Sequence, residues 1–249
     1  MTASRAARAA ARGARPAPPV LVVDTATTRA VIALGTLDGT LVAVDEWEAG
    51  HRHAEELLSR IADLLAGAGI GRPAPGTLAG IVAGTGPGGF TGLRVGLATV
   101  HGIARAAAAP AVGIPTGLAL AAAARATGAV ARDAVVAVLL PAGPTGRYLV
   151  RDGKAALVPP DKAAGDDLAG DLPPGVVLVA VDLAGRAPDD ALARGAHVRP
   201  GLAAALIELG AERLRAGHDD GAALAPEYVT LPRGLAGVAG EVAWSPARP

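Results

Sequence analysis

Residues 84–102 read GTGPGGFTGLRVGLATVHG, and this stretch holds seven glycines in nineteen residues. Glycines gathered in this way usually mean that a phosphate group or another piece of protein lies against the backbone. A short, wholly apolar segment at 78–84 leads into the stretch and is typical of a central parallel strand. The stretch continues into a helix expected over about 91–108. What the glycines face therefore decides both the fold and the kind of function.

The segments before this stretch predict a small antiparallel sheet followed by a helix. Apolar strand patterns occur at 20–28, 30–37 and 40–47, and Asp38-Gly39 between the last two is a strong signal for a tight hairpin. The next segment places leucine and isoleucine at helical spacing, which predicts an amphipathic helix over 53–66.

After the glycine stretch we expect a strand at 110–114 and a helix at about 116–126. The resulting order, β-β-β-α-β-α-β-α, is that of the ribonuclease-H-like half-domain, which is duplicated in the actin, sugar-kinase and Hsp70 group. The expected fold class is therefore α/β, a duplicated actin-like (ASKHA) fold with mixed sheets and flanking helices.

The second half repeats this pattern more faintly. Asp24 and Asp182 each end an apolar strand, which suggests a duplication. Further elements are expected as strands at 134–140, 147–151, 155–158 and 176–182, a loop at 159–175 and a helix at 202–217. We therefore expect four regions, namely a disordered basic extension (1–19), a first ribonuclease-H-like subdomain (20–115), a truncated and degenerate second one (116–231) and a flexible tail (232–249).

The composition excludes several classes of protein. The 249 residues carry no net charge, which argues against binding nucleic acid by bulk electrostatics. The absence of cysteine excludes disulfides, thiolate metal sites and a cysteine nucleophile. Residues 1–19 hold four arginines and no acid, so a disordered extension, an upstream start codon and a nucleic-acid-binding arm are the alternatives there. The uncharged stretch 106–124 is mainly alanine and glycine and contains two prolines, so we expect a soluble, cytoplasmic protein.

The glycines match a phosphate motif only in part. Gly84, Gly86 and Gly89 satisfy G-x-G-x-x-G, but no Asp or Glu occurs between Asp63 and Asp133 to hold a ribose. The same gap argues against a two-metal nuclease. A Walker A loop needs a lysine directly after its glycines, and the first lysine of this chain lies far downstream.

The segment 24–28, Asp-Thr-Ala-Thr-Thr, allows two interpretations. It resembles the turn with which actin-like ATPases approach phosphate, which makes Asp24, Gly86 and Gly88 weak candidates for binding a cofactor. It also fits an aspartate that caps its own turn. No two histidines have the His-x-x-x-His spacing of a helical metal site, so no metal ligand and no catalytic residue is assigned.

The helix expected at 91–108 carries two different faces. Gly88, Gly92 and Gly96 recur every four residues, and small residues at this spacing let another helix approach closely. A neighbouring face is apolar, with Leu93, Leu97, Val100 and Ala104. We expect one face to pack on the chain's own sheet and the other to contact a partner.

Three motifs resemble the bacterial TsaB (YeaZ) family. They are Asp24-Thr25-Ala26-Thr27, His53 at the start of the first helix, and GPGGFTGLRVG at 86–96. The resemblance is strong over about 20–125 and faint beyond. It implies the dimerisation subunit of the machinery that makes N6-threonylcarbamoyladenosine at position 37 of tRNA, with a duplicated actin-like fold and no catalytic function of its own.

The resemblance also implies partners. In the family, the first helices form a bundle with those of a catalytic paralogue, TsaD, and a small ATPase, TsaE, joins the assembly. Here the helices at 53–66 and 91–108 would form that bundle, with the interface residues His53, Leu57, Ile61, Gly88, Gly92, Leu93, Gly96, Leu97 and Val100. Without its partner the chain is expected to pair with itself. It would meet tRNA, ATP and Mg²⁺ only at the level of the complex, and no membrane is expected.

Two features depart from the family pattern. Gly89 replaces the usual serine, and residues 139–148 (LLPAGPTGRY) keep only the tyrosine of a segment that members commonly carry. The competing interpretation is an actin-fold ATP-binding enzyme, an ATPase or a kinase, that contacts phosphate with Asp24 and the 84–91 loop. The missing lysine and acid count against it.

Overall fold

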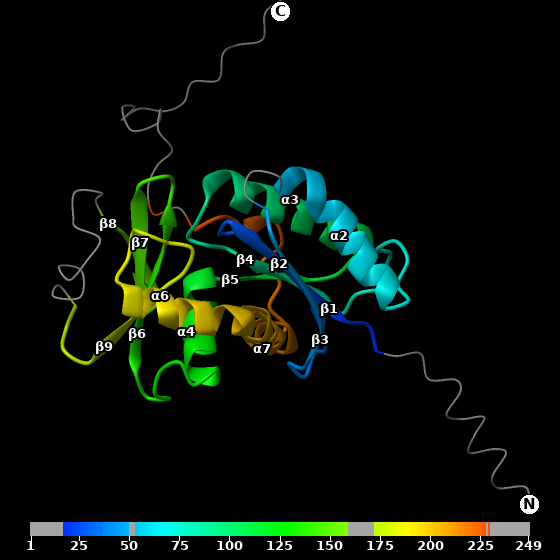
Figure 1. Ribbon diagram of the computed structural model, residues 1–249. Coiled ribbons are helices and arrows are strands. Elements are labelled where there is room, and N and C mark those ends of the chain that lie inside the picture. Colours follow the sequence, from blue (N-terminus) through cyan, green and yellow to red (C-terminus); the bar gives the residue numbers. More distant parts are fainter. Residues whose placement is uncertain (1–16, 50–52, 159–171, 228, 230–249) are drawn as a thin grey trace, which may run out of the picture.

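The computed structural model describes residues 17–49, 53–158, 172–227 and 229. Two mixed β-sheets form its framework (Figure 1). The strands of the first sheet are β1 (Val20–Asp24), β2 (Arg29–Gly35), β3 (Leu41–Glu48), β4 (Gly80–Gly84) and β5 (Ala111–Ile114). Their order is β3-β2-β1-β4-β5, and β1 pairs antiparallel with β2 and parallel with β4.

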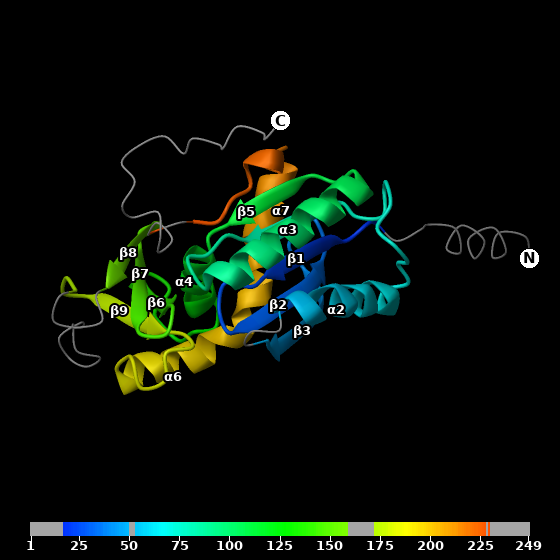
Figure 2. The same ribbon diagram turned by 90° about the horizontal axis from the view of Figure 1, so that it is seen from above.

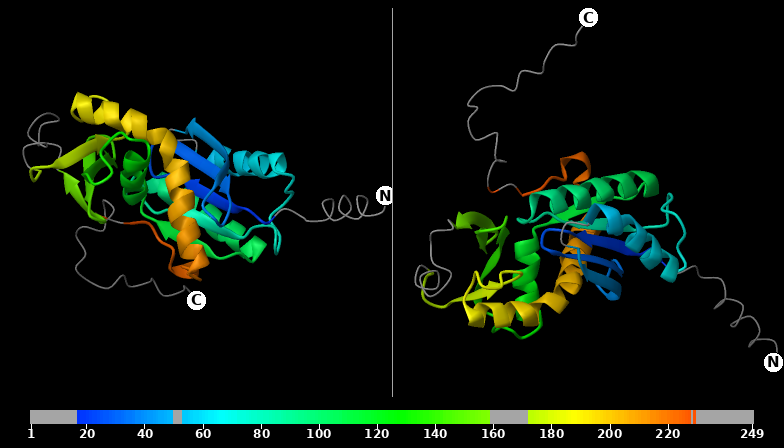
Figure 3. Two further views of the ribbon diagram at one scale, coloured as in Figure 1. Left: turned by 90° about the horizontal axis from the view of Figure 1, so that it is seen from below. Right: turned by 45° about the horizontal axis from the view of Figure 1, so that its top comes forward.

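Helices cover both faces of the first sheet. Helix α2 (His53–Gly67) and helix α3 (Phe90–Ala107) lie side by side on one face, and α7 (Leu202–Arg215) lies on the other (Figures 1 and 3). The sheet is therefore apolar on both sides, and every residue of β1 and β4 is buried. This double coverage explains the wholly apolar sequence of these strands.

The second sheet repeats the first in shortened form. Its strands are β6 (Val135–Ala142), β7 (Gly146–Arg151), β8 (Lys154–Val158) and β9 (Val176–Ala180). Their order, β8-β7-β6-β9, matches β3-β2-β1-β4, and β9 is parallel to β6 as β4 is to β1. The duplicated actin-like fold expected from the sequence is confirmed.

Helix α4 (Thr116–Ala126) joins the two sheets, because it packs on β6 and also on α7 (Figure 2). The largest cluster of buried side chains lies around this contact and includes residues of both sheets. Helix α7, from the second half of the chain, thus covers the sheet of the first half. The predicted boundary at residue 116 stays a prediction.

Most expected elements occur within a few residues of their predicted bounds. The helix α6 (Asp189–Val198), which continues into the 3-10 turn η1 (Arg199–Gly201), was not foreseen. Only Ala191, Gly195 and Val198 are buried in α6, and a Cβ on Gly195 would meet the carbonyl oxygen of Ala180. Two of these three buried residues are alanine and glycine, which a sequence pattern does not mark as core residues.

A short strap closes the edge of the first sheet. It contains the 3-10 turn η2 (Gly221–Ala223), and the Asp220 amide donates to Ala111 while the Asp220 carboxylate accepts from the Gly113 amide at 2.7 Å. The strap therefore satisfies the free backbone groups of β5 as a neighbouring strand would.

Several expectations lie outside the described residues. The predicted tail 232–249 lies wholly outside them, and so do most of the extension 1–19 and of the loop 159–175. Within the described part of the chain, no helix has the length and apolarity that crossing a membrane requires.

Candidate functional site

The turn that joins β1 to β2, residues 24–28, lies at the centre of the molecule and is called the β1–β2 turn below. Its first residue, Asp24, is only 1% exposed. One carboxylate oxygen of Asp24 accepts the amide of Ala26 at 2.9 Å, and the other accepts the Thr116 hydroxyl at 2.7 Å. The Thr116 hydroxyl in turn accepts the Gly86 amide at 3.1 Å. The carboxylate is thus engaged on both oxygens by groups of the same chain.

Burial dominates the ionisation of this carboxyl group. Removal from water raises the pKa of Asp24 above its ordinary value of 3.8. Hydrogen bonds from Ala26 and Thr116 and the charge of Arg199 act in the opposite direction, with smaller effect.

Three glycines of the 84–102 stretch face this turn closely. A Cβ on Gly84 would meet the Asp24 carboxylate, one on Gly88 would meet the Ala26 carbonyl oxygen, and one on Gly96 would meet the Thr25 hydroxyl. The group that lies against these glycines is therefore the chain's own β1–β2 turn.

Hydrogen bonds hold the turn against the start of α3. The Thr25 hydroxyl donates to the Gly92 carbonyl oxygen at 2.8 Å, and the Gly89 amide donates to the Ala26 carbonyl oxygen at 2.7 Å. Close packing and hydrogen bonding together fix the first turns of α3 to the end of β1.

The three candidates for cofactor binding are all withdrawn from solvent. Asp24, Gly86 and Gly88 are buried. In this arrangement Asp24 has no face open to a phosphate or its metal. The interpretation of Asp24 as an aspartate that caps its own turn is the one that the structure supports.

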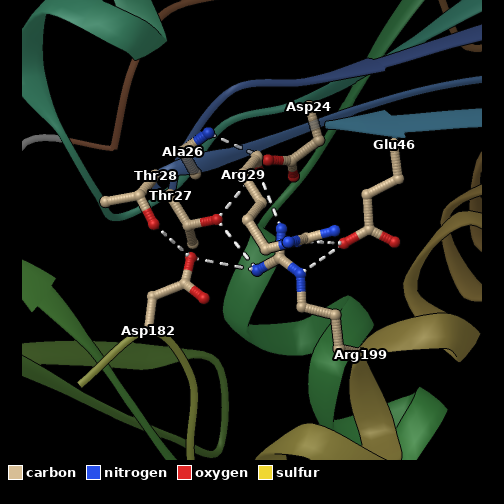
Figure 4. A network of polar contacts seen from close by, with 8 residues as sticks. All are labelled: Asp24, Ala26, Thr27, Thr28, Arg29, Glu46, Asp182 and Arg199. Atoms are coloured by element: carbon tan, nitrogen blue, oxygen red, sulfur yellow. Dashed lines mark hydrogen bonds and ion pairs between the residues drawn. The ribbon is translucent and has the colours of Figure 1, made fainter. Parts of the chain in front are cut away.

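A charged network ties the same turn to the second half of the chain (Figure 4). Arg199 of η1 is 8% exposed. Its guanidinium donates to Glu46 of β3 at 2.6 Å and to Asp182, which follows β9, at 3.1 Å. It also donates to the Thr27 hydroxyl at 3.0 Å and to the Arg29 carbonyl oxygen at 2.9 Å. No local sequence pattern predicts this network, because its members lie far apart along the chain.

A cleft of about 590 Å³ opens beside the turn, between the two halves of the chain. It is lined by residues 25–28 and 89–92 on one side and by Pro141, Gly143, Pro144 and Arg186 on the other. Among the described residues that line it, Arg186 alone is charged, and it donates to the carbonyl oxygens of residues 143, 144 and 146. The divergent segment 139–148 thus forms one wall of this cleft.

A second concave surface lies between α2 and α3 and is called the α2–α3 groove below. It measures about 480 Å³ and is lined mainly by apolar side chains of both helices and of the loop at 70–73. Leu58 is 61% exposed there. Ala62, Ala66, Gly102 and Ala106 are exposed beside it.

The residues predicted for a partner interface are mostly buried inside the chain, and only Ile61 among them lines this groove. Of the nine, eight are buried in the chain itself, namely Leu57, Ile61, Gly88, Gly92, Leu93, Gly96, Leu97 and Val100. His53 begins α2. Periodicity located both helices in the sequence. It did not distinguish Leu57, which faces the sheet, from its exposed neighbour Leu58. Whether a partner docks here stays a prediction.

Among the described residues, no group of three or more His, Asp or Glu side chains is placed to hold a metal ion.

Two glycines of the same helix test the packing against the turn. We predict that Gly96→Ala lowers the free energy of unfolding by about 1–3 kcal/mol, because its Cβ would collide with the Thr25 hydroxyl. Gly102 has nothing within 4 Å of the Cβ position, so Gly102→Ala should stabilise α3 by about 1 kcal/mol. Urea denaturation measures the free energy of unfolding of both variants. Equal changes in this free energy would contradict the close packing of Gly96 against Thr25.

The buried carboxyl group gives a pH dependence. Because the pKa of Asp24 is raised in the folded state, the folded protein holds a proton that the unfolded chain releases above pH 3.8. The wild type should therefore lose stability relative to Asp24→Asn as the pH rises from 3.8 towards neutrality. Thermal denaturation of both proteins over this range measures the difference, and a difference independent of pH would refute the assignment.

Comparisons with known proteins agree with this fold. The family model described as "TsaD: tRNA N6-adenosine threonylcarbamoyltransferase" matches residues 47–171, which is half of the chain. The tRNA threonylcarbamoyladenosine biosynthesis protein TsaB of Escherichia coli (strain K12) is 35% identical over 97 residues. That alignment spans 39% of this chain and 40% of the length of this curated relative.

Two solved structures share the fold over most of the chain. YeaZ from Pseudomonas aeruginosa superposes with a TM-score of 0.60 at 23% identity and covers 85% of this chain and 99% of its own. A protein described as similar to peptidase YEAZ from Pseudomonas aeruginosa gives a TM-score of 0.60 at 21% identity, with 86% and 100% covered. The match to the family model over half of the chain leads to one conclusion: the chain belongs to the family described by the TsaD model, and within it the chain is similar to TsaB and YeaZ proteins.

Proposed function

We propose that this protein is a non-catalytic subunit of an assembly that makes N6-threonylcarbamoyladenosine at position 37 of tRNA. In this proposal it binds a TsaD-like catalytic subunit through the α2–α3 groove. The observation that carries the proposal is this exposed apolar groove on the two helices that the family resemblance singles out. An open apolar surface of this kind is typical of a protein interface.

The distribution of charge around the groove is typical of a docking surface. Among the described residues that line the groove, Arg72 is the one charged residue. The charged side chains of α2 lie elsewhere, as with Arg60, which pairs with Asp45 at 3.0 Å and stacks on Trp47 at 4.6 Å from the ring centre. Apolar centres with charges at the edge are common in interfaces.

The hydrogen bonding of the β1–β2 turn within the chain supports a role other than catalysis. An ATP-using enzyme of this fold would need a carboxylate open to the phosphates or their metal, and both Asp24 oxygens are bonded within the chain. The part of the cleft lining that the structure describes contains one cation, Arg186, and no acid. No observation favours the ATPase or kinase interpretation.

The remaining partners follow from the same proposal. The subunit would form a heterodimer with the TsaD-like protein, a TsaE-like ATPase would join the complex, and tRNA would be bound only by the assembly. In the absence of the catalytic subunit, a second copy of this chain would cover the same groove. The expected location is the cytoplasm.

A pair of matched substitutions tests the interface. Leu58, in the groove, and Val42, on the edge strand β3, are both 61% exposed. We predict that Leu58→Asp weakens binding to the TsaD-like subunit at least about tenfold, because an unpaired charge would be buried there. Val42→Asp should leave the affinity unchanged, and neither variant should melt at a lower temperature. Isothermal titration calorimetry measures both affinities. Equal affinities of the two variants would show that the TsaD-like subunit does not bind at the α2–α3 groove.

A further inference from the structure

We propose that Arg199 is a positioning residue for the partner-binding helix α3. In this inference Arg199 fixes the β1–β2 turn, and the turn fixes the first turns of α3. The idea deepens the proposed function and rests on it only where binding to a partner is concerned.

The first step runs from Arg199 to the turn. Arg199 lies between α6 and α7, in the second half of the chain, yet it makes four hydrogen bonds to three separate segments (Figure 4). Two of them reach the β1–β2 connection, at the Thr27 hydroxyl and the Arg29 carbonyl oxygen. The planar guanidinium can satisfy several acceptors at once in a fixed geometry, which a lysine ammonium cannot do.

The two acidic partners of Arg199, Glu46 and Asp182, would be affected differently by the removal of its side chain. Glu46 is also paired with Arg29 at 3.0 Å, and Asp182 also accepts the Thr28 hydroxyl at 3.0 Å. The side chain of Asp182 is only 12% exposed. Without Arg199, the Thr28 hydroxyl would be the one donor to Asp182 left among the described residues, so the contact between the turn and the segment after β9 would loosen.

The second step runs from the turn to α3. The N-cap residue of α3 is Gly89, which has no side chain to cap the helix. In its place the turn holds the start of the helix, through the Gly89 amide bonded to Ala26 and the Gly92 carbonyl oxygen bonded to Thr25. Any shift of residues 25–27 must therefore move the beginning of α3.

The two steps form one chain of contacts. It leads from η1 through Thr27 to Thr25 and Ala26, and from there to Gly89 and Gly92. Its links are three hydrogen bonds and the covalent backbone of residues 25–27, and Thr25, Thr27 and Gly92 are buried, which strengthens the bonds that they make. The arrangement of the two halves of the chain is thereby connected to the surface that α3 presents.

The direct test compares two arginines. Arg199→Met removes the four bonds, whereas Arg194→Met is the control, since the bonds of Arg194 to Leu178 and Asp190 stay within the second half. Hydrogen–deuterium exchange of the isolated chain should become at least about fivefold faster in peptides covering 89–97 for Arg199→Met. The control should leave these peptides unchanged. Faster exchange confined to the second half would overturn the inference.

A second, milder variant keeps the test decisive if Arg199→Met does not fold. Thr27 is 5% exposed, and Thr27→Val keeps its shape while removing the hydroxyl that accepts from Arg199. It should change the same peptides as Arg199→Met but less strongly, and Arg199→Lys should lie between the wild type and Arg199→Met. Unchanged exchange at 89–97 in Thr27→Val would count against the inference as well.

A double-mutant cycle tests the route. Thr25→Val removes the hydrogen bond to Gly92. If the effect passes through this bond, Arg199→Met should add less to the exchange of 89–97 in the Thr25→Val background than in the wild type. Full additivity would show that the route is wrong.

Binding adds a separate readout. Arg199→Met should weaken affinity for the TsaD-like subunit about fivefold, and Arg194→Met should not. If the wild type does not bind that subunit, the proposed function fails while the exchange experiment still decides the role of Arg199. If it binds and Arg199→Met binds equally well, the positioning role fails.

Discussion

The burial of the β1–β2 turn against α3 is the contact on which the rest of the structure depends. Asp24 ends the central strand, and its carboxylate connects that strand to α4 through Thr116. The following residues, Thr25 and Ala26, occupy the space that glycines leave open at the start of α3. A side chain larger than hydrogen at Gly84, Gly88 or Gly96 would separate these elements, which explains why the glycines stand where they do.

This use of the turn shapes the proposed function. A turn at the end of a central strand, next to a helix N-terminus, is a place where many α/β proteins bind ligands. Here the chain's own groups take up its hydrogen-bonding capacity, and Arg199 connects it to the second half. The open apolar surface lies on the outer side of α2 and α3 instead, so the proposed role is docking.

The sequence predicted the fold well and the site only in outline. Periodicity and turn residues located most strands and helices, because each of these signals is local. It could not show that Leu58 is exposed while Leu57 is buried, since both lie near one apolar stripe. Arg199 and Asp182 meet Glu46 only after folding, and the buried residues of α6 are mostly too small to be recognised as core residues. Long-range polar contacts and packing through glycine and alanine therefore have to be seen in the structure.

Thiol footprinting tests the central claim, that the TsaD-like subunit covers the α2–α3 groove. The chain has no cysteine, so Leu58→Cys and Val42→Cys each introduce a single reactive thiol at an equally exposed position. We expect saturating TsaD-like subunit to slow maleimide labelling of Leu58→Cys at least about tenfold and to leave the labelling of Val42→Cys unaffected. Unchanged labelling of Leu58→Cys in a complex that demonstrably forms would rule out docking at the α2–α3 groove.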